Sequence, residues 1–353
     1  MKNVDKTILF ITFILVAVGI LMVYSSSAFA SLRAKDSSTF FLRKQLIPLG
    51  IGIILLIVMI KTDYHKLGKW SYFFMAASAV LLIAVLVLGS SIHGVRRWIR
   101  FGGISIQPSE FARIAVIIFM ADFISREKLQ NFKHGLLPVL IPLSVIFFLI
   151  GLEPSFGALS VLCLTSFALL FLGGAKVWHL SVLVASVAGA IGFFISQVPY
   201  AKMRIAGLGS QEGYQLQQSI YGLGCGGIFG KGLGSGQGKL LFLPEPHTDF
   251  IFSVIGEEFG FIGCSVVAFL FLLLLMKGIK VGVRSADQFG FLLACGISIG
   301  IFVSACFHIG VVCGVLPTTG LPLPFISFGG SNLLASIIGV GILLNISKMR
   351  DVR

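Results

Sequence analysis

The residues best suited to catalysis form a short polar segment that leads directly into a long apolar one. The segment runs Leu243-Pro-Glu-Pro-His-Thr-Asp249, and Phe-Ile-Phe follows it. A carboxylate at the start of a membrane helix is partly desolvated, which raises its pKa toward that of a general base. An aspartate in that place can also cap the helix, and the two roles are compatible. Asp249 is therefore the candidate base, with Glu245 and His247 as candidate substrate contacts.

Two further acids, Glu257 and Glu258, lie deeper in the same apolar segment. If the segment is a helix, Glu257 lies roughly 12 Å beyond Asp249. Acidic side chains at such depth normally face a cavity or a cation. Two interpretations stay open: a structural ion pair, or a divalent cation held by Asp249 and Glu257.

A second polar group is basic and aromatic, and it comprises Arg96, Arg97, Trp98, Arg100, Glu110 and Arg113. Guanidinium groups match the geometry of phosphate oxygens, so the group predicts a site for a phosphate or diphosphate. The alternative is a belt of side chains that reach the lipid headgroups, with Trp98 at the interface. Glu110 and Arg113 stand three residues apart at the start of an apolar segment, so they can pair on one helix face.

The composition shows what scaffold must hold these residues. Of the 353 residues, 56% are hydrophobic and 12% are charged, with a mean hydropathy of +1.00. A soluble chain has about 25% charged residues, so a soluble enzyme, a disordered chain and a disulfide-stabilised secreted domain are excluded. The expected fold is a single all-α membrane domain over 1–353. Ten transmembrane helices are predicted at about 8–28, 46–61, 71–90, 110–125, 136–152, 158–174, 180–197, 250–276, 289–313 and 331–347.

Most of the irregular chain falls on one face of this predicted bundle. A large loop is expected at 198–249, between the seventh and eighth helices, and its glycine-rich part is expected to be flexible. The apolar stretch Gly314–Ser331 is broken by prolines and glycines, so it cannot be a regular helix. Such backbone is tolerated where it re-enters protein or lines a cavity. These segments together predict one outward-facing site.

The charge distribution predicts the orientation. The chain has 27 Lys and Arg against 14 Asp and Glu, and more than half of the cations fall in the loops and tails of one face. The positive-inside rule places that face, with both termini, in the cytoplasm. The remaining cations lie on the outer face, where an anionic lipid substrate would account for them. Nucleic-acid binding is not expected of a chain with so little soluble mass.

Several strings of residues together resemble one protein family. They are Pro244-Glu-Pro-His-Thr-Asp-Phe-Ile-Phe252 with Ile255-Gly-Glu-Glu-Phe-Gly260, Arg97-Trp-Ile with Gln107-Pro-Ser-Glu110, Gly213-Tyr-Gln-Leu-Gln-Gln-Ser219 with Gly226-Gly-Ile-Phe-Gly-Lys-Gly232, and Gly320-Leu-Pro-Leu-Pro-Phe-Ile-Ser-Phe-Gly-Gly-Ser331. In order and over almost the whole chain, they are similar to the SEDS family of bacterial shape, elongation, division and sporulation proteins. The Gly-Glu-Glu string looks more like the division members (FtsW) or the sporulation members (SpoVE) than like RodA.

The resemblance implies a peptidoglycan glycosyltransferase of the bacterial cytoplasmic membrane. Members of the family polymerise lipid II at the outer leaflet, beside a class B penicillin-binding protein of the division or elongation machinery. The acid of the family's outer loop falls on Asp249, which would deprotonate the acceptor 4-hydroxyl as undecaprenyl diphosphate leaves. Lys231 and Ser327 stand within the shared strings and are further candidate substrate contacts. No organic cofactor is implied, whereas Mg²⁺ or Mn²⁺ can assist a leaving diphosphate.

Two other functions stay open, a lipid II flippase and a non-catalytic scaffold for a penicillin-binding protein. One departure from the family also bears on the site. The family usually reads Gln-Pro-Asp-Leu-Gly-Thr where this chain has Glu153-Pro-Ser-Phe-Gly-Ala158. Ser155 therefore replaces an acid, and Glu153, two residues away, is the candidate to compensate for it.

Overall fold

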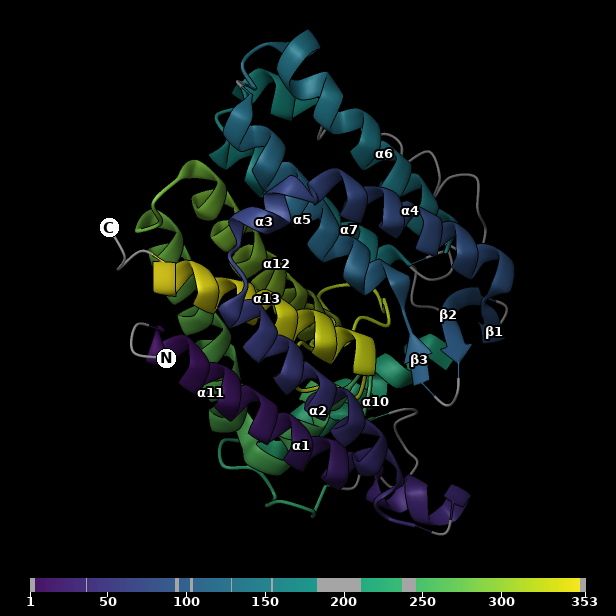
Figure 1. Cartoon of the computed structure of the whole chain (residues 1–353). Helices are drawn as coiled ribbons and strands as arrows, with labels where there is room; N and C mark the ends of the chain where they lie inside the picture. The colour runs from purple at the N-terminus through teal and green to yellow at the C-terminus, as the bar shows by residue number, and fades with distance from the viewer. Residues whose placement is uncertain are drawn as a thin grey trace.

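The computed structural model describes residues 4–35, 37–92, 95–101, 104–127, 129–153, 155–182, 211–236 and 246–349. Within these ranges the chain is a bundle of long helices with one small sheet (Figure 1). The helices are α1 (Lys6–Lys35), α2 (Phe40–Lys61), α3 (His65–Lys69), α4 (Ser71–Leu88), α5 (Pro108–Arg126), the π-helical turn η1 (Phe132–Leu136), α6 (Leu137–Leu152), α7 (Phe156–Leu172), α10 (Gln211–Gly226), α11 (Ile251–Val283), α12 (Gln288–Val312) and α13 (Gly330–Met349). The strands are β1 (Ser90–Ile92), β2 (Val95–Phe101) and β3 (Ile104–Ile106).

Each predicted span except the seventh coincides with a helix in the described part of the chain. Six of these helices, α1, α2, α4, α11, α12 and α13, are long and apolar enough to cross a membrane, and α6 and α7 are shorter apolar helices. The seventh predicted span, 180–197, extends into residues that the structure does not describe. The protein is thus a multi-pass membrane protein.

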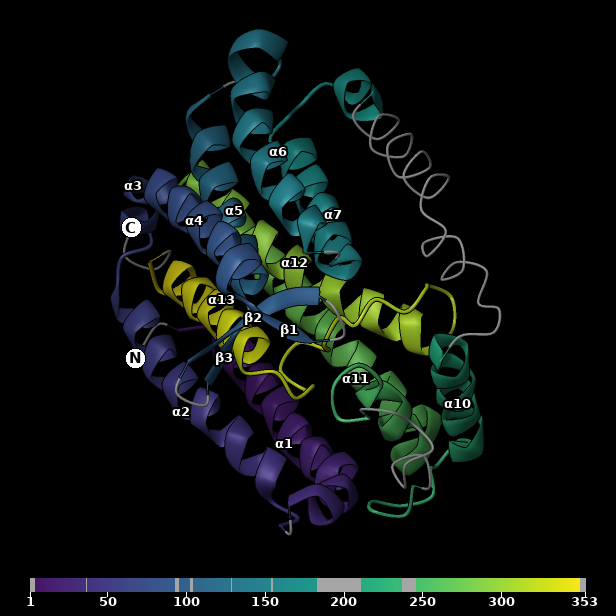
Figure 2. The same cartoon turned by 90° about the vertical axis from the view of Figure 1, so that its right-hand side faces the viewer.

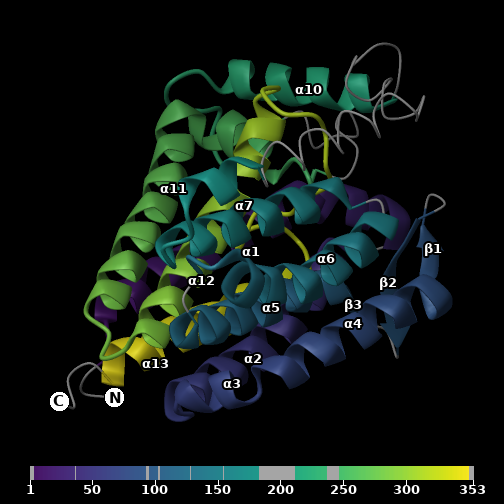
Figure 3. The same cartoon turned by 90° about the horizontal axis from the view of Figure 1, so that it is seen from above.

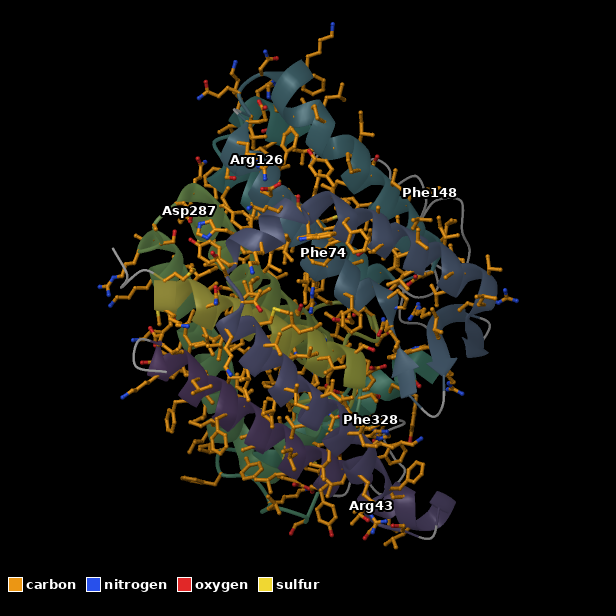
Figure 4. The ribbon with its side chains drawn as sticks, in the orientation of Figure 1. Arg43, Phe74, Arg126, Phe148, Asp287 and Phe328 are labelled. Carbon is orange, nitrogen blue, oxygen red and sulfur yellow. The ribbon has the colours of Figure 1, made fainter. Side chains whose placement is uncertain are left out.

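The two described chain ends lie together at one end of the bundle (Figure 1), where the Asp5 amide donates to the Ser347 hydroxyl at 3.1 Å. We call this the inner end, following the charge distribution, and the opposite end the outer end. Figure 4 shows Arg126 and Asp287 toward the inner end and Arg43 and Phe328 toward the outer end.

The all-α expectation is wrong for the segment between α4 and α5. This segment forms a three-stranded antiparallel sheet in the order β1-β2-β3 (Figure 2), with Ser90 opposite Trp98 and Ile99 opposite Ile106. Val, Ile, Trp and Phe in β2 favour a strand. The register of β2 against β1 shifts by one residue between Trp98 and Arg96, so Arg97 is the extra residue of a β-bulge. Beyond the bulge successive side chains point to opposite faces, so Arg97 points away from the face that carries Arg100.

The described part of the predicted loop 198–249 is also more regular than expected. It contains α10, which lies against the outer end of α11 (Figure 3). The Ser219 hydroxyl donates to the Val312 carbonyl at 3.0 Å, and the Ser253 hydroxyl donates to the Ser219 carbonyl at 2.7 Å. These bonds join α10 to the ends of both α11 and α12.

The glycine-rich segment after α10 is docked on α11 instead of being a flexible loop. Helix α11 is broken at Gly260, whose φ is 67° and ψ −165°. Around the break, backbone groups of 257–262 bond to residues 227–232, and we call these two segments the glycine splice. Its hydrogen bonds run from Lys231 N to Glu257 O (3.0 Å), Gly232 N to Glu258 O (3.0 Å), Phe261 N to Gly227 O (2.9 Å) and Ile262 N to Ile228 O (3.2 Å).

The glycine splice, and the contact between Gly226 and Gly256 directly before it, need glycine where the two backbones approach most closely. A Cβ atom on Gly226 would collide with the Gly256 carbonyl, and one on Gly230 would collide with the Glu258 carbonyl. A Cβ atom on Gly260 would collide with Gly230 N and with the Ile228 carbonyl. Its positive φ is also unfavourable for any other residue. The glycines therefore permit contact between two backbones.

We expect Gly260→Ala to destabilise the protein by about 1–3 kcal/mol or more, because the methyl group adds both a steric clash and backbone strain. The measurement is the thermal unfolding midpoint of the purified protein in detergent. Gly224→Ala is the control, because a Cβ at Gly224 meets no atom within 4 Å. Equal midpoints for Gly260→Ala and Gly224→Ala would contradict the described splice.

Candidate functional site

The chain between α12 and α13, residues 313–329, is irregular as predicted. Its first residues, Cys313 to Val315, are exposed, whereas its second half, from Leu321 to Phe328, packs inside the protein. Leu321, Leu323 and Phe325 are buried, and the Leu321 carbonyl lies 2.8 Å from Nδ1 of His308 on α12. Helix α1 approaches this segment closely, because a Cβ on Gly19 would collide with the Phe325 carbonyl. We call residues 313–329 the re-entrant segment.

The re-entrant segment holds the turn that carries Asp249. The Ser327 hydroxyl donates to the Thr248 carbonyl at 2.7 Å, and the Phe328 amide donates to the His247 carbonyl at 2.9 Å. Gln45 of α2 supports the segment from the other side: its amide donates to the Ser327 carbonyl at 3.3 Å. Two backbone carbonyls directly before Asp249 are thus fixed by an element that lies some 80 residues later in the chain.

Asp249 is not the N-cap of α11, so that interpretation is wrong. The cap residue is Phe250, whose own side chain makes no capping hydrogen bond. Asp249 is instead half-buried in the wall of a pocket.

The pocket has a volume of about 160 Å³ and brings together residues from five elements. Its lining consists of Arg97 from β2, Gln215 from α10, Asp249 and Phe250 at the start of α11, Val311 from α12, and Thr318, Thr319 and Gly320 from the re-entrant segment. A Cβ on Gly320 would lie 3.4 Å from Oδ2 of Asp249, and Gly320 has a φ of +66°. A carboxylate, a guanidinium, an amide and two hydroxyls therefore face one small space.

Arg97 is the member of the basic group that reaches this pocket. Its Nε donates to the Glu153 carbonyl at 2.8 Å, which orients the guanidinium. Arg96 is exposed and donates to the Leu86 and Val87 carbonyls at 3.1 and 3.2 Å, and Arg100 is also exposed. Trp98 is half-buried on the strand face that carries Arg100.

Three polar residues of the pocket were not predicted: Gln215, Thr318 and Thr319. Oγ1 of Thr319 is buried and has no hydrogen-bond partner among the described residues, so it can serve a ligand group. Gln215 stands inside the string Gly213–Ser219 that carries the family resemblance, and both threonines stand in the proline-broken segment. Their types alone do not distinguish them from other loop residues.

The predicted pair of Glu110 and Arg113 is confirmed, with Nη2 of Arg113 at 3.0 Å from Oε2 of Glu110. Both side chains are buried in the bundle. Arg113 also donates to the Ser304 hydroxyl at 2.7 Å, and Asn332 donates to Glu110 at 3.3 Å. This burial places Arg113 among helices α5, α12 and α13 and not on an exposed rim.

His247 and Ser327 are both buried. The His247 ring lies between Phe41 and Phe328, with centroid distances of 4.3 and 5.5 Å. Burial lowers the pKa of His247 to about 4, so the ring is neutral at physiological pH. The Ser327 hydroxyl accepts from the Leu323 amide at 2.9 Å while it donates to Thr248, so it fixes the turn. Glu245 lies outside the described residues.

Lys231 and the deep acids belong to the glycine splice. Nζ of Lys231 lies 3.0 Å from Oε1 of Glu257, and this hydrogen bond raises the pKa of Lys231. The structural ion pair considered for Glu257 is therefore present. Glu258 accepts from the Ser25 hydroxyl of α1 at 2.7 and 2.8 Å. The two deep acids thus hold α1 and the glycine-rich segment against α11.

Glu153, directly after α6, is a fully buried acid next to the pocket arginine. Neither carboxyl oxygen has a hydrogen-bond partner among the described residues. Burial raises its pKa from 4.5 to about 8, although the Arg97 guanidinium acts in the opposite direction. Glu153 is therefore largely protonated at neutral pH.

This shift predicts a pH dependence of stability. Between about pH 4.5 and 8 the folded protein retains a proton on Glu153 that the unfolded chain has lost, so stability falls as the pH rises through that window. Glu153→Gln has the shape of the protonated glutamate and cannot titrate. The unfolding midpoint of this variant should therefore fall less between about pH 5 and pH 9 than that of the wild type. Glu127→Gln, an exposed acid at the other end of the bundle, is the control. Parallel pH profiles for wild type and Glu153→Gln would refute the assignment.

Comparison with known proteins covers the whole chain. Residues 6–352 match the family model described as cell cycle protein, which joins FtsW, RodA and SpoVE. Stage V sporulation protein E of Bacillus subtilis is 38% identical over 357 residues, which cover 98% of this chain and 97% of that relative. A protein of Geobacter sp. named probable peptidoglycan glycosyltransferase FtsW is 38% identical, over 99% of this chain and 98% of its own length.

Solved structures have the same fold as this chain over almost its whole length. One chain of a structure described as "Structural coordination of polymerization and crosslinking by a peptidoglycan synthase complex" superposes with a TM-score of 0.84 at 25% identity, and 99% of both chains is covered. The rod shape determining protein RodA of Thermus thermophilus superposes with a TM-score of 0.74 at 25% identity, over 98% of this chain and 97% of that one. The full-length matches in sequence and in fold show that the chain belongs to the SEDS family of FtsW, RodA and SpoVE proteins.

Proposed function

We propose that the protein is a peptidoglycan glycosyltransferase that polymerises lipid II at the outer face of the cytoplasmic membrane. The observation that supports this most directly is the shared pocket of Asp249 and Arg97 at the outer end of the bundle. The relatives named peptidoglycan glycosyltransferase supply the reaction class.

The polar groups of the pocket suit a sugar reaction with an anionic leaving group. Asp249 serves as general base and takes the proton of the acceptor sugar's 4-hydroxyl. The hydroxyl oxygen then bonds to the anomeric carbon of the donor sugar, and the bond from that carbon to the diphosphate oxygen breaks. Undecaprenyl diphosphate leaves with the electron pair. Threonine hydroxyls and the Gln215 amide are suited to hydrogen bonds with sugar hydroxyls.

Arg97 provides the positive charge for the donor in this proposal. Its guanidinium is held by the Glu153 carbonyl, so it meets a phosphate group without first losing rotamer freedom. A fixed cation that faces developing negative charge stabilises the transition state. The exposed Arg96 and the half-buried Trp98, which do not line the pocket, stay candidates for contacts with the lipid-linked part of the donor.

The residues expected to hold a divalent cation do not fit such a site. Glu257 is engaged by Lys231, and among the described residues no group of three His, Cys, Asp or Glu side chains could hold a metal ion. Asp249 is the acid in the pocket lining. We therefore assign no step of the reaction to Mg²⁺ or Mn²⁺.

The flippase alternative would need a polar path through the bundle. In α5, the residues between Arg113 and Asp122 are all apolar, and most of them are buried. This run separates the buried charges near the outer end from those near the inner end and gives no support to headgroup transport along α5.

The cellular setting is part of the proposal. The chain in the peptidoglycan synthase complex suggests a partner that crosslinks the polymer, and we propose a class B penicillin-binding protein in that role. Similarity to both division and sporulation proteins suggests a role in septal wall synthesis, with both termini in the cytoplasm.

Asp249→Asn should lower the rate of glycan polymerisation by about 10²–10⁴-fold, because the amide cannot accept the hydroxyl proton. The assay measures glycan strands formed from lipid II by the purified protein with its partner, with and without a divalent cation. Glu127→Gln, an exposed change of the same kind far from the pocket, is the control. Polymerisation at the wild-type rate by Asp249→Asn would show that another group is the base.

Arg97→Gln should raise the KM for lipid II by roughly ten-fold or more, since a hydrogen bond to a charged group contributes about 1.5–3 kcal/mol. Arg100→Gln on the opposite face of the same strand should change KM much less. An equal rise in KM for both variants would show that the exposed face of β2 binds the donor instead.

A further inference from the structure

A second pocket lies at the inner end of the bundle, far along the helices from Asp249. It has a volume of about 490 Å³, and its lining consists of Gln130, Asn131, Phe132, Lys176 and His179. Two chain segments form it: the turn between α5 and α6, and the segment that follows α7. Both segments follow helices that run from the outer to the inner end, and Arg126, the last residue of α5, marks this end in Figure 4.

The polar groups around this pocket suit an anion. Among the described residues, the two segments contain Lys133 and Lys176 against the single acid Glu127, and Arg126 at the end of α5 directly precedes the first segment. Among the described residues neither Lys133 nor Lys176 forms an ion pair, whereas Arg126 pairs with Asp122. Gln130 and Asn131 add amide groups, which can donate to phosphate oxygens.

His179 adds a polar ring atom for which the described residues provide no hydrogen-bond partner. Its Nδ1 is shielded from solvent and has no hydrogen-bond partner among the described residues. The ring packs edge-on against Phe132 at a centroid distance of 5.5 Å, which fixes its place in the wall. A buried polar atom without a partner is costly, so a ligand that reaches it would gain that energy.

Exposed apolar side chains flank the same pocket. Phe132 is 50% exposed, Val177 69% and Trp178 74%. Aromatic side chains of this kind sit at the level of the lipid headgroups, with their apolar parts toward the acyl chains. A soluble phosphate compound has no acyl chains to contact these apolar side chains, whereas a phospholipid presents a phosphate beside two acyl chains.

We propose that this inner pocket binds the phosphodiester headgroup of an anionic phospholipid of the cytoplasmic leaflet. Lys176 contacts the phosphate, the amides of Gln130 and Asn131 and the His179 ring hydrogen-bond to its oxygens, and Phe132 and Trp178 border the acyl chains. Basic pockets between transmembrane helices on the cytoplasmic side are suited to such headgroups. The site is separate from the Asp249 pocket and does not depend on the proposed reaction.

The test uses the full chain in lipid nanodiscs of phosphatidylglycerol mixed with phosphatidylcholine, and in nanodiscs of phosphatidylcholine alone. Native mass spectrometry counts the phospholipids that stay bound to the protein after it is released from the nanodisc. The variants are Lys176→Gln, Lys176→Arg and the control Lys280→Gln, which removes an exposed lysine near the inner end of α11. A third arm adds inorganic phosphate in excess.

Wild type and Lys280→Gln should retain phosphatidylglycerol in preference to phosphatidylcholine. Lys176→Gln should weaken this retention by about five-fold, and Lys176→Arg should restore it. Three results would overturn the proposal: no preference for phosphatidylglycerol in the wild type, equal loss in Lys176→Gln and Lys280→Gln, or displacement of the lipid by inorganic phosphate.

Discussion

The constraint on which this structure depends is that backbone polar groups within a bilayer must find partners inside the protein. Helix α11 breaks at Gly260, and the amides and carbonyls around the break bond to the glycine-rich segment after α10. A break without that segment would leave several polar groups without partners in an apolar environment. The glycine splice thus allows an interrupted membrane helix and, at the same time, fixes α10 beside the pocket in which Gln215 lies.

The re-entrant segment follows the same rule and has a more direct functional consequence. Its backbone is satisfied by side chains and carbonyls from distant parts of the chain, among them Gln45, His308 and the turn before Asp249. Tertiary contacts therefore fix the turn that immediately precedes Asp249 and α11. Thr318, Thr319 and Gly320 of the same segment complete the pocket wall.

The buried charged residues of this protein have two different roles, one inside the bundle and one at the pocket. Glu110 with Arg113 and Glu257 with Lys231 are paired inside the bundle and join helices to one another. Charge at the pocket is arranged differently, because Arg97 is oriented by a backbone carbonyl and Glu153 beside it is neutralised by burial. The Arg97 guanidinium lines the pocket, where it can meet an anionic substrate.

The sequence by itself determined the features that depend on local patterns. Apolar runs located the membrane helices of the described residues. Prolines and glycines predicted an irregular segment at 314–331, of which the structure shows all but Gly330 and Ser331 as irregular, and a separation of three residues predicted the pair of Glu110 with Arg113. The tertiary structure decided which polar residues meet. Which of Arg96, Arg97 and Arg100 lines the pocket of Asp249 depends on an unexpected strand with a register shift at Arg97, and it is Arg97 that lines the pocket. Gln215 and Thr319 join them because packing brings together segments that are far apart in the chain, and no local pattern records such contacts.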